Sequence, residues 1–365
     1  MKREHFILAI VIYSLAILYL AFTTPITSHE AKLLFNTNGI VNFLMELGQS
    51  LISGFFGFRL FFVFSGFFAI LFFYEFARRY FPKRDNEYSD AYLATIIFML
   101  LPGIITGSVL SNIAILVLPL VLLFVLLYEK KHFILLPFIM LILFFIHDAS
   151  IIFFIAVMFY GIIYKDKRLA ITAATFLIAF IVMAKGIEIG GRPSGHFIDI
   201  FGLYAAVFSP LVFLYFFYIM YRTLLRGTKT LTWYISFTAL VFSLLLSIRQ
   251  KVHISDFAPY VTISIVLMLD VFNHSIRVRL PEFKKKYKLS FNVIFGSLLL
   301  SASIIFLHQF IFYINENPKK YFANRAYRPY LLAQELKSRG IKCYDSKRSR
   351  EQYQLMYYHI ESCSK

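Results

Sequence analysis

Basic residues alternate with apolar segments along this chain, and that alternation constrains its fold more than any other feature. Apolar segments recur at residues 5–22, 56–76, 91–104, 113–128, 132–146, 149–164, 169–184, 201–221, 231–248, 256–272 and 290–313. Alternate connecting loops hold 20 of the 37 Lys and Arg residues, whereas the intervening loops, Arg59 included, hold six. Because basic loops stay on the cytoplasmic side, we expect an all-α polytopic membrane protein with about 11 transmembrane helices and a cytoplasmic N-terminus.

The same orientation predicts which segments are extracytoplasmic: 23–55, 102–112, 147–148, 185–200, 249–255 and 314–365. The last of these holds the other 11 basic residues, against the general pattern. Charge beyond the last span weighs less than charge in short loops, so the prediction of an extracytoplasmic C-terminus stands.

Composition agrees with this class of protein. The chain is 59% hydrophobic with a mean hydropathy of +0.70, outside the range of ordinary soluble domains. Cytoplasmic loops that face anionic lipid account for much of the net charge of +17, so nucleic acid is not an expected partner. The apolar run after Met1 lacks a small-residue cleavage site and is interpreted as a signal anchor.

Two domains are expected. Residues 1–313 form the membrane domain, and within it residues 23–55 carry interfacial helices interrupted near Gly39. Residues 314–365 form a small α/β tail, with a helix over 329–339 that Gly340 ends and a short strand over 341–344.

The tail holds the two cysteines of the chain, Cys343 and Cys363. In an oxidising compartment such a pair predicts a disulfide; two reduced thiols on an inside tail are the alternative.

The sharpest polar cluster, Thr27–Ala31, follows the first span. A carboxylate at that depth needs solvation, a partner or a function. His29 or Glu30 can serve as a general base or ligate a metal, and His29 can hydrogen-bond to a phosphate. The structural alternative is that Ser28 caps a helix whose positive end Glu30 favours.

A second cluster follows the ninth span. Arg249, Lys251 and His253, followed by Asp256 and Tyr260, suit a phosphodiester at the membrane surface. Ordinary contact of these cations with lipid headgroups is the alternative.

Two further external groups are candidates for a binding wall. Arg192 and His196 belong to a Gly-rich loop that can equally be plain surface. His147 and Asp148 meet at a helix junction and can equally be a structural pair. The sequence contains no serine-hydrolase, nucleotide-loop, zinc-protease or CxxC motif, leaves the cofactor unassigned and keeps a divalent metal open.

Several short motifs, in order, resemble those of C-type glycosyltransferases (the GT-C fold). The quoted stretches are His29-Glu30-Ala31, Phe58-Arg59-Leu60, Ala77–Phe81, Leu100–Gly103 with Gly107-Ser108 and Asn112, and Lys251–His253 with Pro259-Tyr260. The nearest branch is that of protein O-mannosyltransferases and lipid A aminoarabinose transferases, and the resemblance covers roughly residues 5–275. His29 stands where this family usually has an Asp, the expected acceptor-activating base.

The resemblance implies a multi-pass enzyme of the bacterial inner membrane. Its donor would be a polyprenyl-phosphate-linked sugar, and its acceptor a lipid, glycan or protein on the outer side. His29 or Glu30 would activate the acceptor, while Arg59, Arg249, Lys251 and His253 would bind the donor phosphate. The alternatives are a flippase or transporter of lipid-linked saccharide, or a glycan polymerase or ligase.

Overall fold

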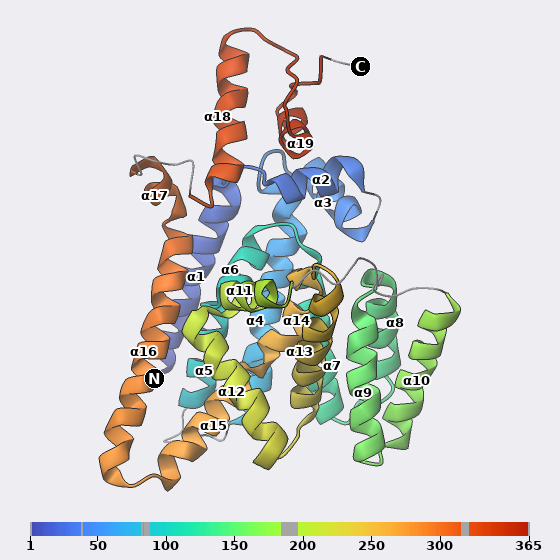
Figure 1. Ribbon diagram of the computed structural model, residues 1–365, viewed down its shortest axis with the longest axis vertical. Coiled ribbons are helices and arrows are strands. Elements are labelled where there is room, and N and C mark those ends of the chain that lie inside the picture. The colour runs from blue at the N-terminus through green and yellow to red at the C-terminus, as the bar shows by residue number, and fades with distance from the viewer. Residues whose placement is uncertain are drawn as a thin grey trace. The chain divides into compact units, whose positions relative to one another are not determined.

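The computed structural model describes residues 2–37, 39–81, 83, 88–183, 196–314 and 321–363. The chain divides into two compact units, whose elements are labelled in Figure 1. Unit 1 comprises Met1–Val11, Ser65–Ile105 and Ile113–Ala302, and unit 2 comprises Ile12–Phe64, Thr106–Asn112 and Ser303–Lys365. Four helices belong partly to each unit: α1 (Arg3–Thr23), α4 (Leu60–Tyr80), α6 (Pro102–Val109) and α16 (Pro281–Phe306).

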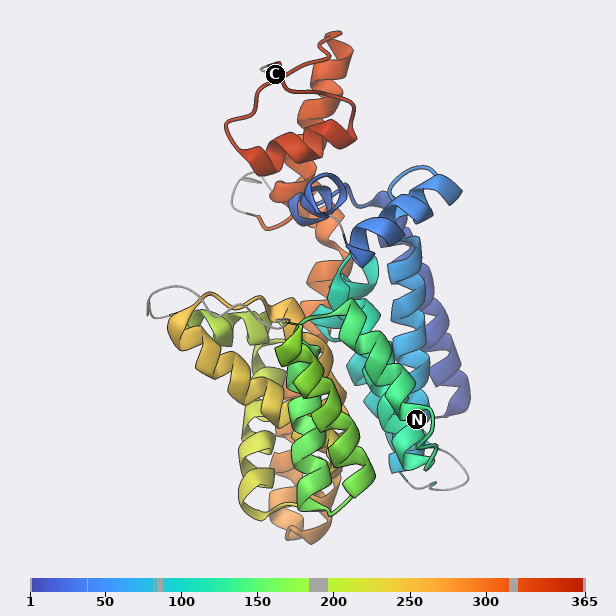
Figure 2. The ribbon, with the colours of Figure 1, turned by 90° about the vertical axis from the view of Figure 1, so that its right-hand side faces the viewer.

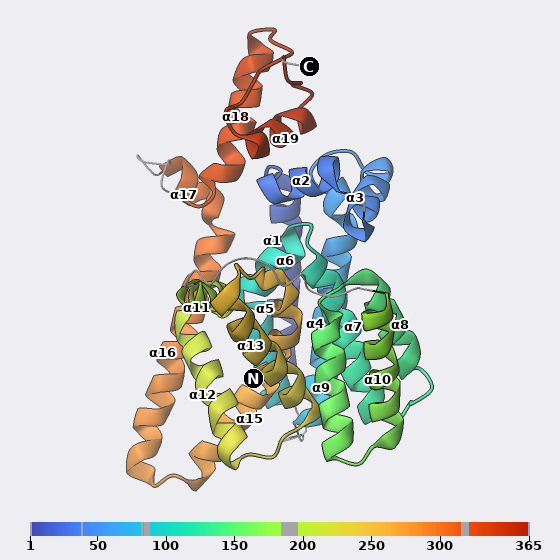
Figure 3. The ribbon, with the colours of Figure 1, turned by 45° about the vertical axis from the view of Figure 1, so that its right-hand side comes forward.

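Apolar helices make up most of unit 1. They are α5 (Ser89–Met99), α7 (Ile113–Glu129), α8 (Leu136–Ile146), α9 (Ser150–Ile163), α10 (Lys167–Val182), α11 (Phe197–Phe208), α12 (Pro210–Arg226), α13 (Leu231–Arg249), η2 (Ile254–Asp256), α14 (Ala258–Val261), η3 (Thr262–Ser264) and α15 (Ile265–Val278). Helix α9 packs against both α10 and α13, and α9 and α10 run side by side in Figures 1 and 3. Gly161 permits the close approach of α10, since a Cβ there would lie 2.7 Å from the Ala170 nitrogen.

Prolines break two of the apolar segments. The expected break at Leu101–Gly103 is confirmed, because α5 and α6 meet at 62° there. The segment expected as one span over 201–221 is not a continuous helix, because α11 and α12 meet at 109° around Ser209 and Pro210. Proline disfavours helical geometry in the residue before it, and Ser209 adopts φ 79°.

The expected count of eleven spans is not confirmed. Within the described residues, five helices are long and apolar enough to cross a membrane, or up to seven if each bent pair is one span. The shorter apolar helices α7, α8 and α9 have 17, 11 and 14 residues. At about 1.5 Å per residue, a helix as short as α8 covers only about half of a ~30 Å hydrocarbon layer.

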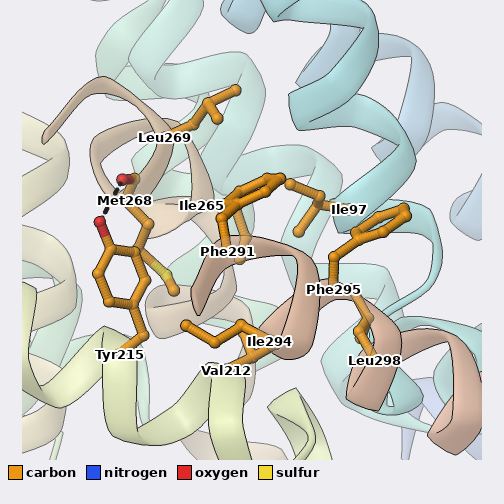
Figure 4. Close-up of a pocket in the computed structure, with 10 residues that line it drawn as sticks. All are labelled: Ile97, Val212, Tyr215, Ile265, Met268, Leu269, Phe291, Ile294, Phe295 and Leu298. Carbon is orange, nitrogen blue, oxygen red and sulfur yellow. Dashed lines mark hydrogen bonds between the residues drawn. The ribbon is translucent and has the colours of Figure 1, made fainter. Parts of the chain in front are cut away.

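An apolar slot of about 30 Å³ lies within unit 1, lined by residues of α5, α12, α15 and α16 (Figure 4). Its one polar side chain, Tyr215, donates its hydroxyl hydrogen to the Met268 carbonyl at 3.3 Å. This slot is too small and too apolar to hold a polar headgroup.

Unit 2 contains two short helices in the segment after α1, where the sequence predicts interfacial helices. They are α2 (Ser28–Asn36) and α3 (Ile40–Leu51), with Gly39 between them as the N-cap of α3. Thr27, not Ser28, is the N-cap of α2, and it forms a capping box with Glu30. The 3-10 turn η1 (Gly57–Arg59) packs against α3, where a Cβ on Gly48 would lie 2.3 Å from the Gly57 oxygen.

The tail folds as helices α17 (His308–Ile314), α18 (Asn324–Ser338) and α19 (Ser349–Tyr357). In Figure 2, α18 and α19 lie beside one another, as their contacts require. Helix α18 and Gly340 at φ 73° match the expected helix and its end, and the Cys343–Cys363 disulfide is formed. The strand expected over 341–344 is reduced to one parallel bridge, Cys343 to Glu361, in the part of the tail that the structure describes.

No partner strand lies alongside residues 341–344 beyond that bridge, so the α/β tail expected from the sequence is helical where it is described. The separate domain predicted for 314–365 stays a prediction. In the structure these residues belong to the same compact unit as α2 and α3.

Candidate functional site

Glu30 lies at the centre of a polar cluster in unit 2, with its side chain fully buried. Its carboxylate accepts hydrogen bonds from Nε and Nη2 of Arg59, both at 2.8 Å. It also accepts bonds from the Thr27 amide and hydroxyl at 2.9 Å and from the Ser111 amide at 3.0 Å. Five donors around one carboxylate leave little room for an incoming proton.

Arg59 is equally saturated. Besides the two bonds to Glu30, Nη1 donates to the carbonyls of Ala21 and Thr24, and Nη2 donates to the carbonyl of Pro25. A guanidinium has five N–H groups, so every one is used within unit 2. In this structure Arg59 therefore has no N–H left for the donor phosphate that the sequence assigned to it.

Electrostatics keep this cluster charged. Burial raises the pKa of the Glu30 carboxyl, but the Arg59 charge and the hydrogen bonds from Arg59, Ser111 and Thr27 outweigh it and lower the pKa overall. A carboxylate held in the ionised form and closed to solvent is a poor general base. His29, next along α2, is exposed.

Five residues that sequence patterns marked lie around one cavity in unit 1. This cavity, about 430 Å³, lies between the junction of α8 and α9 and the segment that follows α13. We call it the outer cavity. Its polar lining residues are His147, Asp148, Gln250, Lys251, His253 and Asp256.

His147 connects the outer cavity to the interior of unit 1. Its Nε2 lies 3.5 Å from Oδ1 of Asp256, and its Nδ1 lies 3.4 Å from the Tyr260 hydroxyl. That hydroxyl is in turn 3.3 Å from the Ser150 hydroxyl. His147 and Tyr260 are buried while Asp256 is half-buried, so the imidazole is held between a carboxylate and a buried phenol.

The remaining predicted site residues divide into three groups. Lys251 and His253 line the cavity and are exposed, as is Asp148. Arg249, the last residue of α13, is exposed but does not line the cavity. His196 lies 3.2 Å from Asp199 one helical turn away, and Arg192 falls outside the described residues.

Sequence patterns missed two residues of these clusters and one residue outside them. Ser111 and Ser150 hold Glu30 and Tyr260 respectively, and Gln354 of α19 donates to the Ile26 carbonyl at 2.8 Å. Ser150 directly follows the His147–Ala149 turn, and a polar residue at that helix start is the signal that marks it. Across the described ranges, no group of three His, Cys, Asp or Glu side chains is placed to hold a metal ion.

Comparison with known proteins defines the fold class. The structure resembles the crystal structure of ArnT from Cupriavidus metallidurans in the apo state, with a TM-score of 0.55 and 12% sequence identity. The likeness covers 96% of this chain and 74% of that chain. At this identity the likeness shows the fold alone: the chain has a GT-C-like fold, and its apolar helices match an all-α polytopic membrane protein. No protein-family model and no curated protein sequence matches the chain.

Proposed function

We propose that this protein is a membrane glycosyltransferase of the GT-C type. It would transfer a sugar from a polyprenyl-phosphate donor to a hydroxyl of a lipid, glycan or protein acceptor on the extracytoplasmic side. The observation that carries the proposal is the outer cavity, which combines a Lys251 cation with the His147–Asp256 pair. The GT-C-like fold supports the reaction class.

The proposed chemistry needs a cation and a base. The acceptor oxygen attacks the anomeric carbon, the bond from that carbon to the phosphate oxygen breaks, and the polyprenyl phosphate leaves with the electron pair. Lys251 would stabilise the charge that develops on the leaving phosphate, and Arg249 and His253 would add to that field. Direct attack of this kind inverts the anomeric carbon.

His147 is the base that we favour. Asp256 would orient the imidazole with the hydrogen on Nε2, and would stabilise the imidazolium that forms when Nδ1 takes up the acceptor proton. The separation of 3.5 Å suits a site whose catalytic hydrogen bonds shorten once substrate is bound. His29 is the alternative base from the sequence pattern, whereas Glu30 and Arg59 would form a structural pair.

The experiment compares variants of the purified protein in transfer of a radiolabelled sugar from polyprenyl phosphate. His147→Ala should lower kcat by about 10²-fold while donor binding persists, as for loss of acid–base help. Lys251→Ala should weaken donor binding by about 1.5–3 kcal/mol, the value of a charged hydrogen bond. Lys288→Ala, an exposed cation of α16, is the matched control and should behave as wild type.

Two results would contradict the assignment. Loss of turnover in His29→Ala with wild-type kinetics in His147→Ala would move the base to α2. Movement of the intact lipid-linked sugar across vesicles without transfer would favour the flippase.

A further inference from the structure

A second polar cavity of about 260 Å³ occurs in unit 1, at the ends of α7, α9 and α4 where they meet the segment before α13. Four tyrosines line it: Tyr80, Tyr128, Tyr160 and Tyr164. We call it the tyrosine cavity. It lies at the helix ends that adjoin the basic loops: Lys130 follows α7, Lys165 follows α9 and Lys229 precedes α13.

Three of these tyrosine rings, those of Tyr128, Tyr160 and Tyr164, contact one another in a row. Tyr160 stacks on Tyr164 with ring centroids 4.6 Å apart and meets Tyr128 edge to face at 5.8 Å. The hydroxyls of Tyr164 and Tyr128 donate to the Lys229 carbonyl at 2.5 Å and to Asp166 at 3.2 Å. These bonds fix the rings and tie the segment before α13 to the end of α9.

Two opposite charges line the tyrosine cavity without pairing. Glu129 and Lys229 both belong to its wall, yet neither makes an ion pair with any residue in the described ranges. Arg79 acts on Glu129 only through its charge, and the Lys229 ammonium lies 5.7 Å from the Trp233 ring. A carboxylate and an ammonium that share a wall but stay apart are complementary to a ligand that carries both charges.

We propose that the tyrosine cavity binds the headgroup of a zwitterionic phospholipid that bears a primary ammonium and a phosphate. The ammonium lies against the Glu129 carboxylate and the faces of the tyrosine rings, which attract cations. The phosphate lies at Lys229, where the hydroxyls of Thr228 and Thr230 add donors. Both charges of the wall are then matched by one ligand.

The position of the cavity favours a lipid over a soluble zwitterion. The helices that form its wall are apolar along their length, and tyrosines at such helix ends lie at the depth of lipid headgroups. A lipid can reach the cavity from the bilayer surface with its acyl chains left in the membrane. This site is independent of the proposed glycosyl transfer.

The test reconstitutes the full-length protein in nanodiscs of equal parts phosphatidylethanolamine and phosphatidylglycerol, and measures the lipids that stay bound by native mass spectrometry. Wild type should retain the ethanolamine lipid about tenfold over the glycerol lipid, the ratio expected for one charged hydrogen bond. Glu129→Gln should remove most of that preference, because the ammonium loses its charged hydrogen bond and keeps only the faces of the tyrosine rings. Lys229→Met should reduce retention of both lipids about tenfold.

Glu282→Gln and Lys288→Met remove exposed charges of α16 and serve as matched controls, with wild-type retention expected. Equal retention of the two lipids by wild type would overturn the proposal, as would wild-type behaviour of both cavity variants. Competition by soluble glycerophosphoethanolamine at the affinity of the lipid would overturn the assignment to a membrane lipid. Thermal unfolding of each variant confirms that the compared proteins are folded.

Discussion

At the scale of single residues, sequence motifs assign Glu30 and Arg59 to catalysis, whereas their contacts are those of a stabilising ion pair. This buried pair stabilises the folded state only while both partners are present. Removal of one partner leaves an uncompensated buried charge. Glu30→Gln should therefore lower the free energy of unfolding by about 3–5 kcal/mol, measured by chemical denaturation in detergent. Glu46→Gln, on the exposed face of α3, is the control and should change it by less than about 0.5 kcal/mol.

The same pair predicts a pH dependence of stability. Folding lowers the pKa of Glu30, so the native state binds fewer protons at this group than the unfolded chain does. Its contribution is present above the ordinary carboxyl value of 4.5 and is lost as the pH falls through the lower folded value. The melting temperature of wild type should thus fall more steeply below that pH than that of Glu30→Gln. Parallel curves of melting temperature against pH for the two proteins would show that the Glu30 carboxylate does not stabilise the folded state in this way.

At the scale of elements, the bend at Ser209 is the feature that the hydropathy pattern could not reveal. Ser209 is buried and its φ of 79° lies in the left-handed region, which costs an L-residue about 1 kcal/mol and costs glycine almost nothing. Ser209→Gly should keep or raise the free energy of unfolding by up to about 1 kcal/mol. Ser290→Gly in the exposed part of α16 should instead lower it by about 0.5–1 kcal/mol. A strong loss in Ser209→Gly would contradict the bent pair.

A second prediction at the scale of elements concerns the loss of the disulfide in the tail. Cys343 and Cys363 close a segment that contains α19, and Gln354 of that helix bonds to Ile26. Loss of the closure in Cys343→Ser should reduce tail stability by about 3 kcal/mol in the chain-entropy model. Limited proteolysis should then cut 344–362 at protease levels that spare the oxidised wild type. Equal resistance of both proteins would mean that packing alone orders α19.

At the scale of the whole molecule, charge and hydropathy patterns predicted the fold class, and local chemistry predicted the helix breaks near Gly39, Pro102 and His147. These patterns did not identify residues whose role depends on a partner far away in the sequence. Nothing near Ser111 in the sequence links it to Glu30, and one-dimensional hydropathy cannot separate a bent pair such as α11 and α12 from one span. Sequence patterns marked His147, Lys251 and Asp256 singly, because polar groups are few in so apolar a chain, but did not predict that they line one cavity.

The prediction for the whole molecule concerns its orientation in the membrane. With a cytoplasmic N-terminus, cysteines introduced at Ser28 and Ser255 should react with a membrane-impermeant reagent in intact cells. One introduced at Lys285 should react only after permeabilisation. Labelling of Lys285 from outside would invert the topology and remove the outer cavity from the extracytoplasmic side.

The central claim, that the outer cavity transfers a lipid-borne sugar, is tested most directly by the products of a reconstituted reaction. Purified protein in liposomes would receive a polyprenyl-phosphate-linked sugar and a mixture of lipid and glycan acceptors, and mass spectrometry would follow both the lipid and the sugar. We predict free polyprenyl phosphate and glycosylated acceptor in equal amounts with wild type, and loss of both products with His147→Ala or Lys251→Ala. Undiminished amounts of both products from those two variants would contradict the claim.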